Sequence, residues 1–194
     1  MYRIVFIIVL LTLTGCAGKF PALQESSSMP VDAACRVTIL PFIDKGSFTR
    51  GGAVFAKVFL TELIASGHFQ VVEEGDVIEL YQQFKIFPNQ QPDSEQLKKI
   101  SGRLGTTLFV GGEILKMEEH KQGVYLDPGL TVMLRLYSGQ TGEEVWTTYH
   151  SRRGKDYQQV LHFGRINTLT SLAKEMSGEI ITLWLEKGII PCAG

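Results

Sequence analysis

The sequence predicts an α+β fold, a single domain in which helices pack on one mixed β-sheet of about five strands. Short β-branched runs typical of strands stand beside longer stretches with apolar residues at helical spacing. Strands and helices alternate in the first half of the chain, whereas three strands follow one another in the second half. This order, β-α-β-α-α-β-β-β-α, is typical of an α+β domain rather than a regularly alternating one.

Each predicted element rests on the period of its apolar residues. Strands show β-branched runs or alternate apolar with polar residues, and helices show apolar residues three and four apart. In the first helix, Phe55, Phe59 and Leu63 share one face, and Gly67 follows as a stop. In chain order we expect strand 36–42, helix 53–66, strand 68–74, helix 76–87, helix 94–105, strands 106–119, 130–138 and 143–153, and helix 167–187.

The pattern of the later strands predicts an antiparallel pair. Val132, Leu134 and Leu136 alternate with other residues at the period of a half-buried antiparallel strand. Residues 138–142 (SGQTG) then provide a tight, glycine-rich connection to the next strand. The final helix carries a long apolar stripe, so we expect it to cover the sheet.

The first 20 residues contain an apolar run that ends in LTGC. Residues 4–13 are apolar except Thr12, which gives about ten apolar residues, whereas a membrane-spanning helix needs about 20. This length is typical of the apolar region of a signal peptide. The residues that end in Cys16 resemble a bacterial lipobox, so we predict a lipoprotein signal peptide over residues 1–15 and a lipid on Cys16. The alternative is an uncleaved signal anchor with an incidental cysteine.

The expected location and charge narrow the classes of partner. Ala17 stands where lipoproteins of the inner membrane commonly carry Asp, so the resemblance implies the periplasmic face of the outer membrane. The chain has 19 Lys and Arg against 20 Asp and Glu, a balance that gives no electrostatic basis for binding nucleic acid. Residues 16–34 are rich in Ser, Ala and Pro without periodicity, and we expect a flexible lipidated tether there. The periplasmic domain then covers residues 35–194.

Two further cysteines bracket this domain. Cys35 precedes the first strong strand, and Cys192 is the third residue from the end of the sequence. In an oxidising periplasm, two such cysteines predict one disulfide. A redox or metal-binding pair is the alternative, but no histidine or third cysteine lies near either of them in sequence.

The sequence offers contact features rather than catalytic ones. No G-x-S-x-G, P-loop, H-E-x-x-H or C-x-x-C motif is present, and the four histidines are scattered, which is typical of surface or capping residues. We therefore expect no enzyme, no metal, no small-molecule substrate and no cofactor other than the covalent lipid. The candidate interface residues are Tyr157, His162, Phe163, Arg165, Trp146 and Tyr149.

Two readings of residues 155–168 stay open. The segment connects the last strand to the last helix and is too apolar for an idle linker, so it is either an interface or an early extension of the helix packed on the core. Trp146 and Tyr149 lie on opposite faces of the last strand, so we expect one of them to face away from the core.

Four ordered motifs resemble a known superfamily. They are V-x-x-L-P-F (residues 37–42), V-V-E (71–73), L-G followed by V-x-G-x-I (104–114), and L-R-L followed by T-G-E-x-V-W (134–146). In this order they resemble the periplasmic core shared by the curli-secretion lipoprotein, the Pel exopolysaccharide export lipoprotein, the TolB amino-terminal domain and the lipoprotein activators of penicillin-binding proteins. The resemblance covers about residues 36–188.

This resemblance implies a role at the outer membrane. The curli channel inserts two long hairpins into this core to cross the membrane, but the two possible insertion sites here are too short. We therefore expect a non-enzymatic component of an export or secretion apparatus, for exopolysaccharide or a curli-like substrate, without a pore of its own. It would be a homo-oligomer that works with an outer-membrane channel protein. The alternative is a lipoprotein regulator that docks onto a peptidoglycan synthase.

Overall fold

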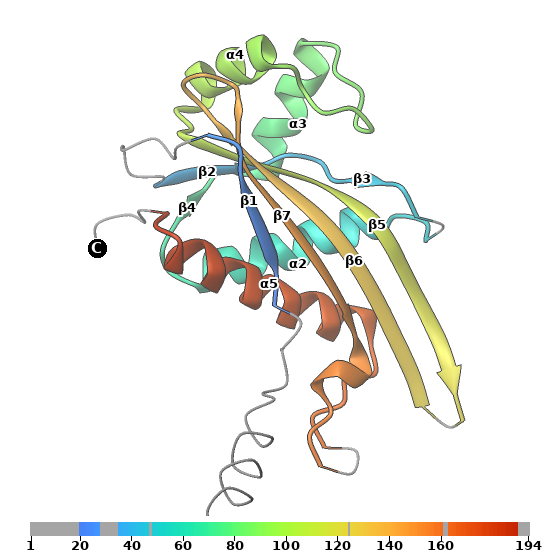
Figure 1. Cartoon of the computed structure of the whole chain (residues 1–194). Coiled ribbons are helices and arrows are strands. Elements are labelled where there is room, and N and C mark those ends of the chain that lie inside the picture. Colours follow the sequence, from blue (N-terminus) through green and yellow to red (C-terminus); the bar gives the residue numbers. More distant parts are fainter. Residues whose placement is uncertain (1–19, 28–34, 47, 124, 161–162, 190–194) are drawn as a thin grey trace, which may run out of the picture.

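The computed structural model describes residues 20–27, 35–46, 48–123, 125–160 and 163–189. Over these ranges the chain forms one mixed seven-stranded sheet with helices packed on it (Figure 1). The predicted α+β fold is therefore confirmed, with two strands more than expected. The elements are β1 (Ala22–Glu25), β2 (Arg36–Ile39), β3 (Ile43–Asp44), α2 (Gly51–Ala65), β4 (Gln70–Val71), α3 (Glu74–Gln83), α4 (Ser94–Leu104), β5 (Leu108–Gln122), β6 (Tyr125–Ser138), β7 (Glu144–Arg153), the short 3₁₀ helix η1 (Gly154–Tyr157) and α5 (Leu169–Glu186).

The order of the strands explains why helices lie on both faces of the sheet. The strands are arranged β1-β7-β6-β5-β2-β4, and β3 also pairs with β5. β2 and β4 run parallel, as do β2 and β5, whereas β5, β6, β7 and β1 pair antiparallel. The chain passes from β2 outward to β4 and then back across β2 to β5. Because both crossovers prefer the same hand, they place their helices on opposite faces.

Two hydrophobic clusters occupy these faces. On one face α2 and α5 pack on the sheet, where Phe59 stacks with Phe55 and meets Trp184 edge-on at 5.5 Å between ring centroids. On the other face α3 and α4 enclose a second cluster around Leu40, Ile100 and other buried apolar residues. α4 begins with a capping box, in which Asp93 accepts from the backbone of Gln96.

The N-terminal strand β1 corrects part of the tether prediction. Ala22–Glu25 pair antiparallel with β7, Ala22 opposite Tyr149 and Glu25 opposite Trp146, and Leu23 packs against the core. The expectation of a flexible tether is therefore wrong for these four residues. The segment ALQE has little β-propensity of its own, and the open edge of β7 supplies the hydrogen bonds that make it a strand.

The β5–β6 hairpin is longer than the sequence predicts. β5 continues to Gln122 and β6 begins at Tyr125, in place of the expected 106–119 and 130–138. Pro128 argues against a strand there, but pairing between β6 and β7 begins only at Gly129. Pro128 therefore lies where one side of β6 is an edge, and its missing N–H leaves no gap in the ladder.

Three predictions fall partly or wholly outside the described residues. The signal peptide of residues 1–15 and the lipidated Cys16 lie there, as does Cys192. Cys35 is a disulfide-bonded cysteine, but its pairing with Cys192 stays a prediction. Among the described helices, none has the length and apolar character needed to cross a membrane.

Candidate functional site

The six predicted interface residues separate into different places. Trp146 is buried in the core at 3% exposure, so it offers nothing to a partner. Tyr149 lies on the opposite face of β7 and is 43% exposed, which confirms that one of this pair faces away from the core. Tyr157, Phe163 and Arg165 lie between β7 and α5, and His162 is outside the described residues.

Four exposed apolar side chains gather at one end of the molecule. Tyr125 and Leu126 begin β6 at the tip of the hairpin, and Val160 and Phe163 lie in the segment between η1 and α5. Val160 is 70% and Phe163 75% exposed, and the two hairpin residues are about two-fifths exposed. The hairpin and this segment project in the same direction (Figure 1). We call these four residues the apolar end.

The segment that carries Val160 and Phe163 is fixed to the hairpin by charge. Asp127 of β6 is almost fully buried and forms an ion pair with Arg153, Oδ2 to Nη2 2.9 Å. Its other carboxylate oxygen accepts a hydrogen bond from the backbone N–H of Lys155 at 3.1 Å. A buried carboxylate that meets a guanidinium and a backbone donor is well satisfied, so this contact holds the start of η1 against β6.

Two cation–π contacts extend this attachment. The guanidinium of Arg165 lies 5.3 Å from the ring centre of Tyr125, across the gap between the segment and the hairpin. Arg152 lies 5.1 Å from the ring centre of Tyr157, which is half-buried and packs against the core. Tyr157 and Arg165 thus act as braces, and each such contact contributes about 0.5–1 kcal/mol at an exposed site.

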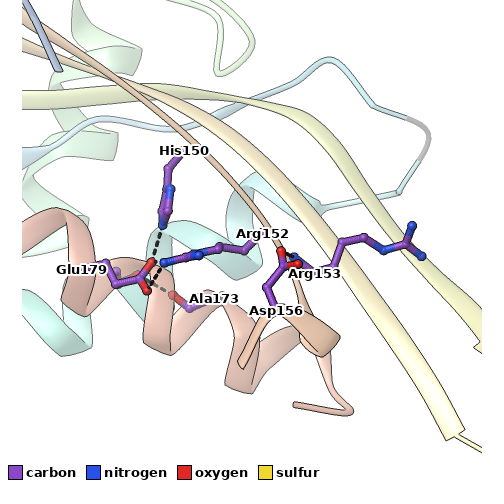
Figure 2. A network of polar contacts seen from close by, with 7 residues as sticks. His150, Arg152, Arg153, Asp156, Ala173 and Glu179 are labelled. Carbon is purple, nitrogen blue, oxygen red and sulfur yellow. Dashed lines mark hydrogen bonds and ion pairs between the residues drawn. The ribbon is translucent and has the colours of Figure 1, made fainter. Parts of the chain in front are cut away.

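A second polar network joins β7 to α5 beneath this segment. Figure 2 shows His150 and Arg152 converging on Glu179. The Nη2 of Arg152 donates to Oε1 of Glu179 at 2.6 Å, and Nε donates to Oε2 at 3.1 Å, while His150 contacts the same Oε2. Burial alone raises the pKa of Glu179, but the hydrogen bonds from His150 and Arg152 outweigh burial and hold that pKa below its ordinary value.

The interpretation of residues 155–168 as an early extension of the last helix is wrong. The chain leaves η1 at Tyr157 and turns at Gly164, whose φ of 81° is a left-handed conformation that glycine adopts without strain. α5 begins only at Leu169, where the hydroxyl of Thr168 accepts from the backbone N–H of Ser171. Val160 and Phe163 are therefore displayed on a braced loop, whereas Tyr157 and Ile166 of the same segment pack against the core.

Sequence reasoning missed Tyr125, Leu126 and Val160. Tyr125 and Leu126 follow Gly123, which has a positive φ and so marks the turn of the hairpin. The β-prone residues after this glycine could have shown that the hairpin continues, had Pro128 not argued for a loop. Val160 follows two glutamines and precedes Leu161, and these residues show neither helical nor strand periodicity.

The chemistry available at this end is that of contact. Among the described residues, no group of three or more His, Cys, Asp or Glu could hold a metal ion. Asp127 is paired with Arg153 and Glu179 with Arg152, whereas the four side chains of the apolar end are exposed. Such a surface fits another apolar surface.

The fold belongs to a class seen in bacterial lipoproteins. No family model matches the sequence, and no curated protein sequence matches it either. Among solved structures, the chain is similar to the PelC dodecamer from Paraburkholderia phytofirmans, with a TM-score of 0.55 and 14% identity over 84% of this chain and 95% of that one. It is similar to lipoprotein GNA1162 from Neisseria meningitidis, with a TM-score of 0.55 and 13% identity over 78% of this chain and 99% of that one.

A weaker similarity is to the LpoB C-terminal domain from Escherichia coli, with a TM-score of 0.47 and 15% identity over 64% of this chain and 87% of that one. PelC is one of the proteins that the four sequence motifs resemble. The resemblance is therefore confirmed at the level of the fold.

Proposed function

We propose that this chain is a lipid-anchored, oligomeric and non-enzymatic component of an outer-membrane export apparatus. The apparatus exports either an exopolysaccharide or a curli-like substrate. It lies on the periplasmic face of the outer membrane, held by the lipid on Cys16, and acts by contact with copies of itself and with an outer-membrane channel protein. The observation that carries the proposal is the direction of β1, which aims the anchor and the apolar end at the same surface.

The pairing of β1 fixes where the chain leaves the domain. β1 runs antiparallel to β7, so its N-terminal end points toward Arg153 and η1. The β5–β6 hairpin extends toward the same end, because Gly129 of β6 lies opposite Arg153. Figure 1 places the start of β1 above the projecting η1 segment and hairpin. A membrane that holds Cys16 therefore faces the apolar end.

The length of chain before β1 allows Cys16 and the apolar end to reach the same membrane surface. Five residues separate Cys16 from Ala22, and the six steps between them span at most about 20 Å at ~3.3 Å per residue. Ala22 is level with Met133, since both lie opposite Tyr149. The hairpin continues eight residues beyond Met133 to Tyr125, or about 26 Å at ~3.3 Å per residue. The apolar end thus extends at least as far as the anchor allows.

The side chains at this end suit a membrane surface. Phenylalanine, tyrosine and leucine prefer the boundary between headgroups and acyl chains, and nearby cations are attracted to anionic lipids. Lys121 and Arg165 supply such cations beside the four apolar residues. A second contact of this kind would hold the anchored domain in one orientation on the membrane.

We expect the apolar end to bind vesicles without the lipid. Residues 16–194, which include every described element, would carry Cys16→Ser and be mixed with vesicles of phosphatidylethanolamine and phosphatidylglycerol (3:1). Replacing Val160 and Phe163 with Asp should lower the co-sedimenting fraction at least about fivefold, since charges resist entry into the interface.

The matched control places two Asp residues elsewhere. Ile64 and Phe87 are 56% and 67% exposed and lie on α2 and after α3. The Ile64→Asp, Phe87→Asp variant should bind vesicles like the parent. An equal loss of vesicle binding in both variants, or no loss in the Val160→Asp, Phe163→Asp variant, would contradict the membrane-facing orientation.

Oligomer formation is a separate expectation. The similarity to a dodecamer of PelC supports it, and a ring would place many anchors and many apolar ends on one membrane. Native mass spectrometry of the same soluble protein, over a range of concentrations, should show a closed assembly of one defined size. A strict monomer at the highest concentration contradicts an oligomeric component.

The regulator of a peptidoglycan synthase is less well supported. Such a role requires the domain to extend away from the membrane toward the cell wall. Pairing of Ala22–Glu25 with β7 shortens the free tether to the residues before β1 and keeps the domain close to the bilayer.

A further inference from the structure

A cavity of about 580 Å³ lies between α2 and α3, far from the apolar end. It is formed by the residues that follow β2, by one side of α2, by α3 and by the start of the α3–α4 connection. In sheets with parallel strands, the space beyond the carboxyl ends of the strands is where ligands bind, especially where crossovers leave to opposite faces. Here the crossovers after β2 and β4 do so. The volume is within the range of small-molecule sites.

The floor of this α2–α3 cavity is apolar and uncharged. It is lined by buried aliphatic and aromatic side chains, among them Leu40, Phe42, Val77 and Ile86. The ring of Tyr81 completes the floor, and no described residue bonds to its buried hydroxyl. Burial raises the pKa of Tyr81, so the phenol is neutral at physiological pH. Apart from this one neutral hydroxyl, the deep part matches an apolar occupant.

Charged groups stand only at the rim. Arg50 and Lys57 are exposed cations seven residues apart, two turns along the same side of α2, and neither forms an ion pair within the described chain. Two carboxylates also line the cavity: Asp44 accepts from the backbone N–H of Gly52 at the start of α2, and Glu74 lies in the first turn of α3. Asp44 keeps its charge but is held by the helix terminus, so Arg50, Lys57 and Glu74 are the rim charges that form no ion pair among the described residues, and two of these three are cations.

Arg50 also holds an unfavourable backbone conformation. Its φ of 65° and ψ of 20° are left-handed, and only one other described non-glycine residue, Lys85, has a positive φ. Lys85 lies between Gln82 and Ile86, which both line the cavity. Residues other than glycine adopt this conformation at a cost, and such strain gathers at ligand sites.

We propose that the α2–α3 cavity binds a single-chain anionic amphiphile, such as a long-chain fatty acid, with the acyl chain on the apolar floor and the anionic group beside Arg50 and Lys57. The acyl chains on Cys16 are not the occupant, because they bring no anionic group to pair with these cations. The inference is independent of the proposed function, and either one stands if the other fails.

Fluorescent cis-parinaric acid tests the site directly. Titrated into residues 16–194 with Cys16→Ser, it should give saturable one-to-one binding that palmitate displaces. Ala53 is exposed and lines the cavity, so Ala53→Trp should block it and weaken binding at least about tenfold. Val54 is the next residue, also exposed but not part of the lining, and Val54→Trp should leave binding unchanged. Equal effects of the two variants overturn the site.

Variants of the rim cations Lys57 and Arg50 provide a second test of ligand binding. Lys57→Glu should weaken binding about tenfold, whereas Lys99→Glu on α4, outside the cavity, should not. Arg50→Gly removes both the cation and the strained conformation, so it should weaken binding while the Tm is unchanged or higher. A variant that lowers the Tm and leaves binding intact would show that Arg50 is only structural.

Photocrosslinking separates this occupant from a protein. A benzoylphenylalanine placed at Gln82, on the wall of the cavity, reports what lies there. Any crosslink that it forms to protein should decrease when palmitate is present, because palmitate then fills the cavity. Specific capture of a second copy, or of another protein, that palmitate does not reduce would overturn the proposal in favour of a docking groove.

Discussion

Replacing Glu179 with Gln lowers the free energy of unfolding by about 3 kcal/mol, because it leaves the guanidinium of Arg152 without its anion. The side chain of Arg152 is 10% exposed and that of His150 only 1%, so neither is well compensated by water. Removal of one partner from such a buried network typically costs 3–5 kcal/mol, and the part-exposed Glu179 puts the cost at the lower end. Urea unfolding followed by circular dichroism measures the change.

The dependence of stability on pH distinguishes this network from simple packing. The pKa of Glu179 is lowered in the folded protein, so the contribution of this carboxylate is present above its unfolded pKa of ~4.3 and is lost as the pH falls through the folded value. The difference in stability between the parent and Glu179→Gln should therefore shrink below about pH 4.

Glu175 provides the control on the same helix. It is exposed one turn earlier on α5, and no described side chain forms an ion pair with it. Glu175→Gln should change stability by less than about 0.5 kcal/mol at any pH. A similar loss for both variants, or a gap between parent and Glu179→Gln that stays constant from pH 7 to 3, contradicts the role assigned to the network.

The same network shows where sequence reasoning reaches its limit. A lone histidine near a strand end predicts a surface or capping residue, yet His150 is almost fully buried and contacts Glu179. The partner is 29 residues away on another element. Hydrophobic period assigns each residue to a face of its own helix or strand, but only the packing of α5 across β7 brings these two together.

The elements themselves follow from local patterns. Helical spacing around Phe55, Phe59 and Leu63 predicts α2 to within two residues, and alternation at Val132, Leu134 and Leu136 predicts the buried half of β6. The exceptions are elements that exist because of a neighbour. β1 forms because β7 has an open edge, and the outer part of the hairpin forms although Pro128 argues against it.

The candidate surface was predictable only in part. Phe163 stands out as an aromatic residue in a connection, which is a signal that sequence carries. The burial of Trp146 depends on which face of β7 meets α5, and that choice is made by tertiary packing. The cavity between α2 and α3 gives no sequence signal, because its lining combines ordinary core residues with a few exposed ones from four separate segments.

Replacing Gly154 with Ala lowers the free energy of unfolding by about 2–3 kcal/mol and loosens the segment that carries the apolar end. Gly154 is the buried first residue of η1, and a Cβ there would overlap the carbonyl oxygen of Ile166 and lie 2.9 Å from Cδ of Pro128. The N–H of Ile166 donates to the carbonyl of Gly154 at 3.1 Å, so this close approach closes the loop. A backbone group cannot move aside as a flexible side chain does, which makes the clash costly.

Gly178 is the matched control, with an effect of opposite sign. It lies inside α5, and a Cβ there would meet nothing within 4 Å. Gly178→Ala should therefore raise the free energy of unfolding by about 0.5–1 kcal/mol through its higher helix propensity. If Gly154→Ala instead leaves stability and vesicle binding unchanged, the attachment of the loop to β6 and β7 does not position the apolar end. If it weakens vesicle binding at a temperature where the domain is still folded, the rigid display of Val160 and Phe163 is itself part of membrane contact.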